Sequence, residues 1–362
     1  MKKKIEDGSN SLSLLDYKLL HTNGFFNSII AKSFAKNPLS IIDVGARWGI
    51  NQMFEPIAGF THALSFEPDP IESKLITEKE ENKGIWYKSE VLPYALSDKN
   101  EEIKLYLLKR PNNSSIFKVK KHVYNRYKLR GFEFEKEIIV PAITLDNFFL
   151  KQKKNFPNLG EIIKLDTQGA EHKILKGAKN VLKNNTMCII CEVSFFSPYE
   201  KACNLTDIID TLKSMGFHLY GFLDYKFRST KRFNKRNSIG RERLMQADAV
   251  FFKDPFEKKN RLIKESDRKK EVIFLASLLL GYFDFSCEIL ESLGYSSLEK
   301  KALRIVLNNL AFKDFSYIKK ETKKLQNYLN SNDKKAFLEL AKITDSRRDF
   351  FSYHDLYVNY EE

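Results

Sequence analysis

Apolar residues along this chain alternate between short continuous runs and longer stretches in which they recur at helical spacing. Short apolar runs bounded by turn residues predict buried strands, and the stretches between them predict helices. A regular alternation of strand and helix is typical of a doubly wound α/β fold, in which helices cover both faces of a mostly parallel sheet. The predicted strands are residues 39–44, 63–66, 86–91, 162–166, 187–193, 217–223 and 247–252.

Two regions are additions to this alternation. Residues 1–37 carry apolar positions at helical spacing, broken at Asn23-Gly24, and predict two short helices that cover one edge of the sheet. Two further strands, 103–108 and 137–143, predict a β insertion over residues 102–143. Such an insertion commonly shapes a binding pocket.

The last part of the chain has a different character. Residues 256–362 show helical periodicity without strand signals, and they predict an all-α C-terminal region after the α/β domain at 38–255. We expect this region to serve dimerisation or docking. It therefore offers a route to a homo-oligomer.

The turn after the first predicted strand carries the first functional signal. Asp43 lies inside the strand, and Gly45 and Gly49 allow the backbone to turn sharply and approach a ligand. Their spacing leaves less room for phosphates than the dinucleotide pattern G-x-G-x-x-G. On its own, a tight strand-to-helix turn without a ligand would show the same residues.

An acid follows the second predicted strand. Glu67 lies about 20 residues after the glycine turn, where doubly wound folds place the carboxylate that binds a ribose. An acid ahead of the helix predicted over 71–82 would also be stabilised by the helix dipole. Taken alone, Glu67 therefore leaves both roles open, whereas Asp69, which precedes a proline, fits the helix start better.

A series of motifs then carries a family resemblance. The motifs are D-V-G-A-x-x-G from Asp43, F-E-P from Phe66, A-x-S-D from Ala95, T-L-D from Thr144 and K-x-D-x-x-G-x-E-x-x-x-L-x-G-A from Lys164. In this order along the chain, over residues 39–253, they resemble the FkbM family of methyltransferases.

The resemblance implies a class I (Rossmann-like) methyltransferase fold with S-adenosyl-L-methionine as the cofactor. Taken alone, the pair Ser97-Asp98 also fits a simple turn. The resemblance implies that Asp43, Gly45, Ala46 and Gly49 surround the methionine portion, that Glu67 binds the ribose, and that Ser97 and Asp98 contact the adenine.

The chain departs from the family pattern at two places. Arg47 and Trp48 fill positions where small or polar residues are commoner, and Thr167-Gln168 replaces the more usual Val-Glu pair. With these departures we still expect cofactor binding, while the identity of the acceptor stays open.

The strongest candidates for catalysis are two carboxylates. Asp166 ends the fourth predicted strand and Glu192 ends the fifth, so both should lie where the methyl group is transferred. Such a pair can remove a hydroxyl proton, orient the acceptor or hold a divalent metal ion. His172 titrates near neutral pH and is a third catalytic candidate. Its place inside a predicted helix favours an exposed or capping role.

Positive charge is concentrated in one segment. The net charge is +14, and residues 226–243 hold eight basic side chains against one acid. Arginine binds phosphate through two parallel hydrogen bonds, which favours a phosphate-bearing acceptor held by Arg228, Arg232 and Arg236. A solvated loop without a ligand is the alternative.

Hydropathy and cysteine content indicate a soluble, cytoplasmic protein. No apolar run approaches the roughly 20 residues that span a bilayer, and the N-terminus lacks a signal-peptide pattern. Cys188 and Cys191 form C-x-x-C inside a predicted strand, where they point to opposite faces. We therefore expect buried free thiols at these positions and no metal ligation.

The sequence thus predicts an S-adenosylmethionine-dependent O-methyltransferase. Its expected acceptor is a hydroxyl of a sugar or glycan precursor in surface polysaccharide or secondary-metabolite biosynthesis. One alternative is an RNA methyltransferase or nucleic-acid-binding protein, which the absence of a recognisable RNA-binding signature disfavours. The other is a catalytically inactive scaffold, which the retained Asp43, Glu67 and Asp166 disfavour.

Overall fold

A computed structural model of the chain forms two compact units, Ser13–Leu307 and a second unit of Met1–Leu12 with Asn308–Glu362. The first unit extends past residue 255, where the sequence predicts the start of the helical region. Helix α13 (Phe315–Asn330) belongs to the second unit. The structure describes residues 17–152, 158–230, 242–260, 263, 266–311, 315–331 and 336.

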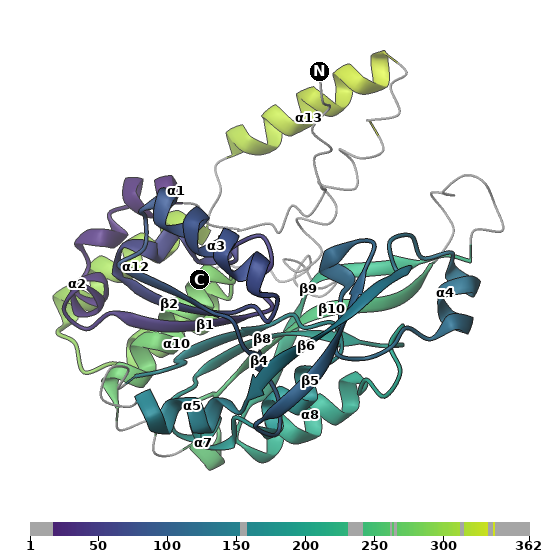
Figure 1. Ribbon diagram of the computed structural model, residues 1–362. Coiled ribbons are helices and arrows are strands. Elements are labelled where there is room, and N and C mark those ends of the chain that lie inside the picture. The colour runs from purple at the N-terminus through teal and green to yellow at the C-terminus, as the bar shows by residue number, and fades with distance from the viewer. Residues whose placement is uncertain are drawn as a thin grey trace. The chain divides into compact units, whose positions relative to one another are not determined.

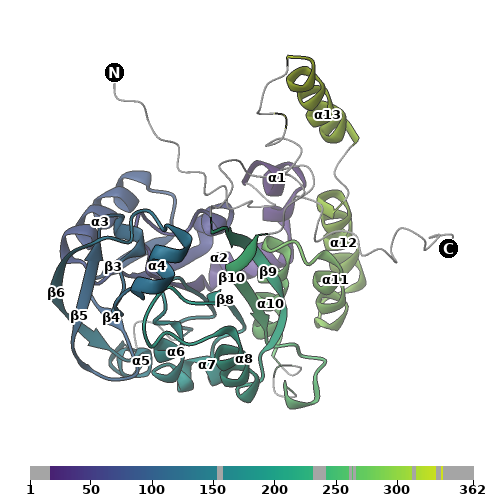
Figure 2. The same ribbon diagram turned by 90° about the vertical axis from the view of Figure 1, so that its right-hand side faces the viewer.

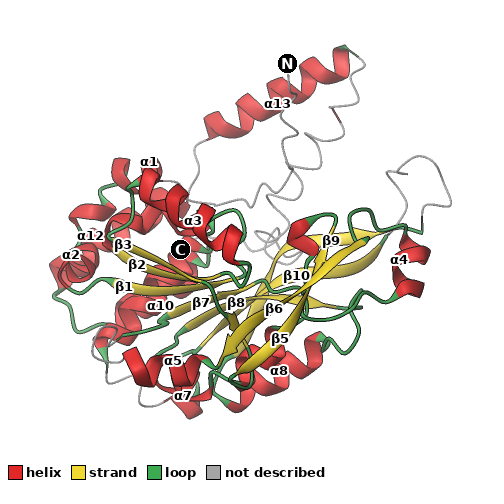
Figure 3. Cartoon of the chain, viewed as in Figure 1, coloured by secondary structure: helices red, strands yellow, loops and turns green. Residues whose placement is uncertain are grey.

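A seven-stranded sheet forms the centre of the first unit (Figures 1 and 3). Its strand order is β3-β2-β1-β7-β8-β10-β9, and every neighbouring pair is parallel except the two that β10 makes. The chain runs outward from β1 to β3 and then crosses to β7, which creates a switch point between β1 and β7. The predicted doubly wound, mostly parallel sheet is therefore confirmed. The strands are β1 (Leu39–Val44), β2 (Thr61–Phe66), β3 (Lys88–Leu92), β7 (Ile162–Leu165), β8 (Cys188–Ser194), β9 (His218–Arg228) and β10 (Arg243–Phe252).

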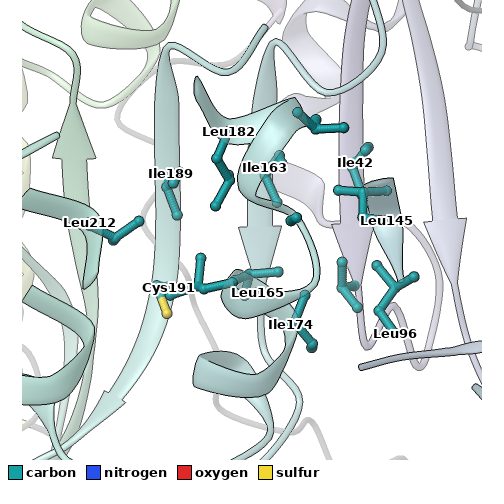
Figure 4. Close-up of a cluster of buried hydrophobic side chains, with 14 of the residues drawn as sticks. Ile42, Leu96, Leu145, Ile163, Leu165, Ile174, Leu182, Ile189, Cys191 and Leu212 are labelled. Carbon is teal, nitrogen blue, oxygen red and sulfur yellow. The ribbon is translucent and has the colours of Figure 1, made fainter. Parts of the chain in front are cut away.

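Four helices cover one face of this sheet and enclose a hydrophobic core. Figure 4 shows Ile42, Ile163 and Ile189 on the strands, facing Leu182 and Leu212 on the helices. Burying these apolar side chains supplies most of the driving force for closing the layer, at about 25 cal/mol per Å². The helices are α5 (Leu145–Gln152), α6 (Glu171–Lys176), α7 (Lys179–Asn184) and α8 (Leu205–Ser214).

The opposite face is covered by η2 (Gln52–Phe60) and α10 (Asp267–Leu279). Ile162 and Ile190 alternate with the residues of the first core, because successive strand side chains point to opposite faces. Together with Phe54 of η2 and residues of α10, they line a small cavity. Apolar side chains thus cover both faces of the central strands, as the continuous apolar runs predict.

A second, three-stranded sheet has the order β4-β6-β5. Figure 2 shows its strands gathered on the left of the view. Strands β5 (Glu101–Leu108) and β6 (Phe134–Ile143) are the predicted added pair, and they run antiparallel. The short strand β4 (Ala95–Leu96) pairs in parallel with β6 and is absent from the sequence prediction. Between β5 and β6 lie η3 (Pro111–Asn113) and α4 (Lys121–Tyr127).

The N-terminal helices pack on η2. Helices α1 (Tyr17–Thr22) and α2 (Ile29–Lys36) both contact η2, and the Phe34 ring stacks on Phe60 with 5.6 Å between centroids. The short η1 (Phe25–Asn27) joins them, and α3 (Pro70–Lys83) lies against the edge strand β3.

Helices follow the last strand, after the short η4 (Lys258–Asn260). Helix α10 ends at Leu279, and α11 (Phe283–Ser292) begins two residues beyond Gly281. Helix α12 (Ser297–Ala311) comes next. Among the described helices, none is long and apolar enough to cross a membrane. Cys188 and Cys191 are buried free thiols in β8, as predicted.

Candidate active site

The turn after β1 has a backbone that only glycine fits at two positions. Gly45 has φ +81°, and a Cβ atom there would lie 2.1 Å from the main-chain oxygen of Asp166. Gly49 has φ +110°, and its Cβ would lie 2.4 Å from a carboxylate oxygen of Glu80. Left-handed backbone and close approach both demand glycine. The turn is thus pressed against the end of β7 and against α3.

Two acids brace this turn. Asp43 is buried and accepts a hydrogen bond of 2.8 Å from the Asn51 N–H, while its burial raises the pKa of its carboxyl group. Glu80 accepts hydrogen bonds from the Ile50 N–H and the Trp86 indole, at 3.2 and 2.8 Å. Ala46, also buried, accepts a hydrogen bond from the Gly49 N–H. The residues predicted around the methionine portion therefore form one rigid loop.

Glu67 lies next to this loop at the end of β2. Strand register pairs Val44 with Phe66, so the next residues, Gly45 and Glu67, lie opposite each other just beyond β1 and β2. The Glu67 side chain is buried, and burial raises the pKa of its carboxyl group to about 7. Asp69 caps α3 by accepting hydrogen bonds from the Ile71 and Glu72 N–H groups. Asp69 thus fills the helix-capping role that the sequence left open for Glu67.

Ser97 and Asp98 lie against α6 and β6. The Ser97 N–H donates to the Ile143 oxygen, and its hydroxyl donates to Asp98. Asp98 forms an ion pair of 3.5 Å with Lys173, and this charge holds the pKa of Asp98 below its usual value against the opposing effect of burial. Their contact with adenine stays a prediction.

The two predicted catalytic carboxylates lie side by side at the ends of β7 and β8. Register pairs Leu165 with Cys191, so Asp166 and Glu192 are the next residues on neighbouring strands. The side-chain amide of Gln168 donates to both, at 2.9 Å to Asp166 Oδ1 and 3.0 Å to Glu192 Oε2. A single amide therefore joins the two carboxylates.

Residues of other strands complete the surroundings of this pair. Lys226 Nζ on β9 lies 2.9 Å from Glu192 Oε1, and the Gln246 amide on β10 donates to Glu192 Oε2 at 3.1 Å. Register places Asp248 opposite Glu192. Lys164 Nζ on β7 lies 3.5 Å from Asp166 Oδ2. We call Lys164, Asp166, Gln168, Glu192, Lys226, Gln246 and Asp248 the carboxylate cluster.

The charges of the carboxylate cluster shift its titration in opposite directions. Burial, together with the neighbouring Asp166 charge, raises the pKa of Glu192 to about 8, and burial raises the pKa of Asp248 to about 6. Burial would also raise the pKa of Asp166, but Lys164 and Lys226 outweigh it and hold that pKa below its usual value. Near neutral pH, Asp166 is therefore ionised and Glu192 is poised to exchange a proton.

His172 does not join the carboxylate cluster. Its Nδ1 lies 2.8 Å from the Cys203 sulfur, and its Nε2 lies 3.0 Å from the Thr211 hydroxyl. Burial lowers the pKa of His172, which favours the neutral ring. Both nitrogens are thus engaged with α8 and the segment before it, and a catalytic role for His172 stays a prediction.

With this geometry in place, the chain can be compared with known proteins. Residues 43–219 match the model of the Methyltransferase FkbM domain. The chain contains an FkbM methyltransferase domain. No curated protein sequence matches it.

Solved structures of methyltransferases resemble parts of the chain. A methyltransferase FkbM from Methylobacillus flagellatus KT has 12% identity and a TM-score of 0.35, covering 60% of this chain. Magnesium protoporphyrin IX methyltransferase from Synechocystis PCC 6803 has 10% identity and a TM-score of 0.30, covering 64% of this chain and 80% of its own length. This chain spans 44% of the length of the Methylobacillus protein.

The FkbM match does not include the whole carboxylate cluster. The match contains the glycine turn, Asp166, Gln168 and Glu192. It ends at residue 219, near the start of β9 and before β10. Lys226 and Asp248 therefore lie outside the matched residues. These parts of the cluster have to be understood from this chain itself.

The residues around Asp166 and Glu192 do not fit a divalent metal ion, a possibility that the sequence had left open for this pair. Such an ion takes six or more oxygen ligands, whereas the pair here accepts hydrogen bonds from the amides of Gln168 and Gln246. The Lys226 ammonium group also faces Glu192. Across the described residues, no group of three or more His, Cys, Asp or Glu is arranged to hold a metal. We assign no catalytic step to a metal ion.

The basic segment, residues 226–243, is only partly described. Arg228 ends β9 and lies opposite Arg243 of β10. The Arg243 guanidinium lies 4.1 Å from the centre of the Phe196 ring. Arg232 and Arg236, the other predicted phosphate ligands, lie outside the described residues.

The β insertion borders the carboxylate cluster. Val119 forms a β-bridge with Tyr199, and the Lys120 N–H donates to the Pro198 oxygen at 2.7 Å. The Tyr199 hydroxyl donates to the Gln168 side-chain oxygen at 3.0 Å, and the Ser115 hydroxyl donates to the Gln168 main-chain oxygen at 2.7 Å. The insertion therefore helps to build the site, as its position in the sequence suggested.

The sequence prediction did not assign six members of this site, which are Lys164, Gln168, Tyr199, Lys226, Gln246 and Asp248. Gln246 and Asp248 are polar residues at alternating positions of an otherwise apolar strand, which places both on one face. That alternation is the signal that could have found them. Gln168 belongs to the Thr167-Gln168 departure from the family pattern, but neither Gln168 nor Tyr199 carries a pattern that predicts contact with the carboxylates.

Proposed function

We propose that this chain is an S-adenosylmethionine-dependent O-methyltransferase whose acceptor is a hydroxyl of a phosphate-bearing sugar or glycan precursor. The observation that carries the proposal is the approach of Gly45 to Asp166, which brings the glycine turn into backbone contact with the carboxylate cluster. A cofactor held at the turn and an acceptor held at the cluster would therefore meet at the β1–β7 switch point.

The cofactor side fits a nucleoside with a short charged tail. Glu67 is a buried carboxylate at the position where doubly wound folds bind ribose hydroxyls. Hydroxyl donors from a ribose would favour its ionised form and offset the burial that raises its pKa to about 7. When bound, S-adenosylmethionine supplies a methyl group whose bond to sulfur breaks with both electrons staying on sulfur.

The acceptor side fits a hydroxyl group. An ionised Asp166 can accept a hydrogen bond from the acceptor and orient it, while Glu192 can take the hydroxyl proton as the oxygen is methylated. A base with a pKa near 8 is well matched to this task close to neutral pH. Lys226 balances the negative charge of the pair before and after proton transfer.

A phosphate on the acceptor is supported by the arginines at the rim. Arg228 and Arg243 occupy paired positions of β9 and β10. Guanidinium groups bind phosphate through paired hydrogen bonds, so two arginines at neighbouring strand positions are suited to a phosphate-bearing acceptor. Lys226, which contacts Glu192, lies two residues before Arg228. A phosphate bound by Arg228 and Arg243 would therefore lie close to Glu192.

The test begins with calorimetry of S-adenosylmethionine and its demethylated product, S-adenosylhomocysteine. We expect low micromolar affinity, equivalent to about 8 kcal/mol. An acceptor screen should then include nucleotide sugars and glycan precursors with and without phosphate, with methyl transfer followed by mass spectrometry. Absence of binding by either nucleoside would overturn the proposal in favour of a scaffold.

Binding to RNA at two salt concentrations separates the remaining alternative. Polymer binding releases counterions and therefore weakens steeply with salt. Tight, salt-sensitive RNA binding together with methylation of RNA would replace the glycan acceptor by a nucleic acid.

A further inference from the structure

Gln168 has a backbone conformation that is costly for its residue type. Its φ is +56°, in the left-handed region that side chains with a Cβ atom rarely adopt. It lies in the turn between β7 and α6, directly before Gly169. Such strain persists only where the surroundings hold it, and it is concentrated at functional sites.

Polar contacts hold Gln168 on every side. Its Nε2 donates to Asp166 and to Glu192, its Oε1 accepts from Tyr199, and its main-chain oxygen accepts from Ser115. The carboxylates are acceptors when ionised, so the amide nitrogen must face them. The contacts thus fix both the rotamer and the orientation of the amide.

The position of this amide matters because the two carboxylates repel each other. The Asp166 charge contributes to the raised pKa of Glu192. Without a hydrogen-bond donor between them, the two carboxylates would move apart or one of them would keep a proton. Glycine would relieve the backbone at residue 168 but could supply no such donor. The chain therefore keeps a strained glutamine where the amide is needed.

We infer that Gln168 is a positioning residue, whose amide holds Asp166 and Glu192 together as one unit that receives the acceptor hydroxyl. The inference rests on the proposed function for the role of the pair, but the hold of Gln168 on the pair is a separate property of the fold. The charged and titratable groups that face Glu192 are Asp166 and Lys164 from β7, Glu171 from α6, Tyr199, Lys226 from β9 and Asp248 from β10.

The deciding variant is Gln168→Gly, because glycine accepts the left-handed backbone and removes the side chain that carries the amide. Relief of backbone strain offsets part of the cost of the lost hydrogen bonds, so we expect the variant to fold and to keep its affinity for S-adenosylmethionine. Turnover should fall by about 10–100-fold, with a smaller change in the acceptor KM, because the reacting groups lose their alignment.

A second readout needs no acceptor. Glu192 can be titrated by NMR in protein labelled with ¹³C-glutamate, with Glu192→Gln identifying its signal. Loss of the amide donor should move the Glu192 titration to higher pH in Gln168→Gly. Gln168→Glu has the same size but replaces a donor by an acceptor, so it should move the titration at least as far.

Lys201→Gly is the matched control. The exposed Lys201 also has a left-handed backbone, with φ +58°, so this change releases strain without touching the carboxylate cluster. It should raise stability and leave turnover and the Glu192 titration unchanged.

If Gln168→Gly keeps wild-type turnover and titration, the inference is wrong and the contacts of Gln168 are only structural. If the wild type lacks methyl transfer altogether, the proposed function fails, and the NMR titration still decides whether Gln168 holds the pair.

Discussion

The glycine turn after β1 owes its form to its backbone conformation, whereas the carboxylate cluster is formed by side chains from separate parts of the chain. The turn needs glycine at residues 45 and 49 because neighbouring atoms leave no room for a Cβ. Around Glu192, strands β9 and β10 bring Lys226 and Gln246 to the carboxylate, and the turn after β7 brings the Gln168 amide. The turn should therefore be sensitive to added volume, and the carboxylate cluster to changes of charge.

The largest effect is expected from adding one methyl group to the turn. Gly45→Ala would place its Cβ 2.1 Å from the Asp166 oxygen, so the ends of β1 and β7 would have to separate. We expect the free energy of unfolding to fall by more than about 3 kcal/mol, with loss of cofactor binding.

Gly24→Ala separates crowding from backbone strain in that experiment. Gly24 has a similar φ of +75° but no atom within 4 Å of its Cβ position. Its substitution should cost only the strain of about 1–2 kcal/mol. Equal losses in chemical denaturation of the two variants would show that the turn is not limited by volume.

The next largest effect concerns charge in the carboxylate cluster. Asp166→Asn and Glu192→Gln keep size and remove the negative charge, so turnover should fall by about 10²–10⁴-fold with little change in cofactor affinity. Steady-state kinetics and calorimetry measure the two quantities. Glu90→Gln on β3 is the control and should leave turnover unchanged. Wild-type turnover in both cluster variants would reject the carboxylate mechanism.

A smaller effect links Glu67 to stability. The pKa of Glu67 in the folded protein is about 7, above the ordinary value of 4.5. The contribution of Glu67 to the free energy of unfolding is therefore complete below pH 4.5 and is lost as pH rises through 7. The shift corresponds to about 3 kcal/mol. Glu67→Gln should therefore unfold at higher denaturant than the wild type near about pH 8, and at the same concentration below about pH 4.5.

The same Glu67→Gln substitution should weaken cofactor binding by about 1.5–3 kcal/mol, because a charged acceptor of hydrogen bonds is lost. A protein that is more stable but binds less tightly would show that Glu67 is retained for the ligand. Unchanged affinity in calorimetry would remove Glu67 from the ribose site.

The smallest effect is expected at His172. Its ring nitrogens lie within hydrogen-bond distance of Cys203 and Thr211, so His172→Gln should cost about 1 kcal/mol of unfolding free energy. Turnover should stay close to that of the wild type. A kinetic loss as large as that of Glu192→Gln would instead establish His172 as a catalytic residue.

The sequence by itself determined the central strands and the glycine turn. The continuous apolar run of β1 predicts a strand buried on both faces, and every residue of Leu39–Val44 is buried. The sharp turn at Gly45 and Gly49 and the place of Glu67 after β2 could be predicted, because they depend on the backbone of the same few residues or on the distance from a strand end. The ends of β9 and β10 were missed, because polar residues such as Lys226 extend these strands beyond their apolar runs.

Only the tertiary structure decided which side chains meet at the carboxylate cluster. Glu192, Lys226 and Gln246 are far apart in sequence, and their contacts depend on the register of β8, β9 and β10. A one-residue shift in that register would turn each side chain to the opposite face. His172 is close to Asp166 and Gln168 in sequence, but its ring contacts α8 and does not reach the carboxylate cluster. Local patterns fix the elements, whereas the partners of a buried charge are fixed by how those elements pack.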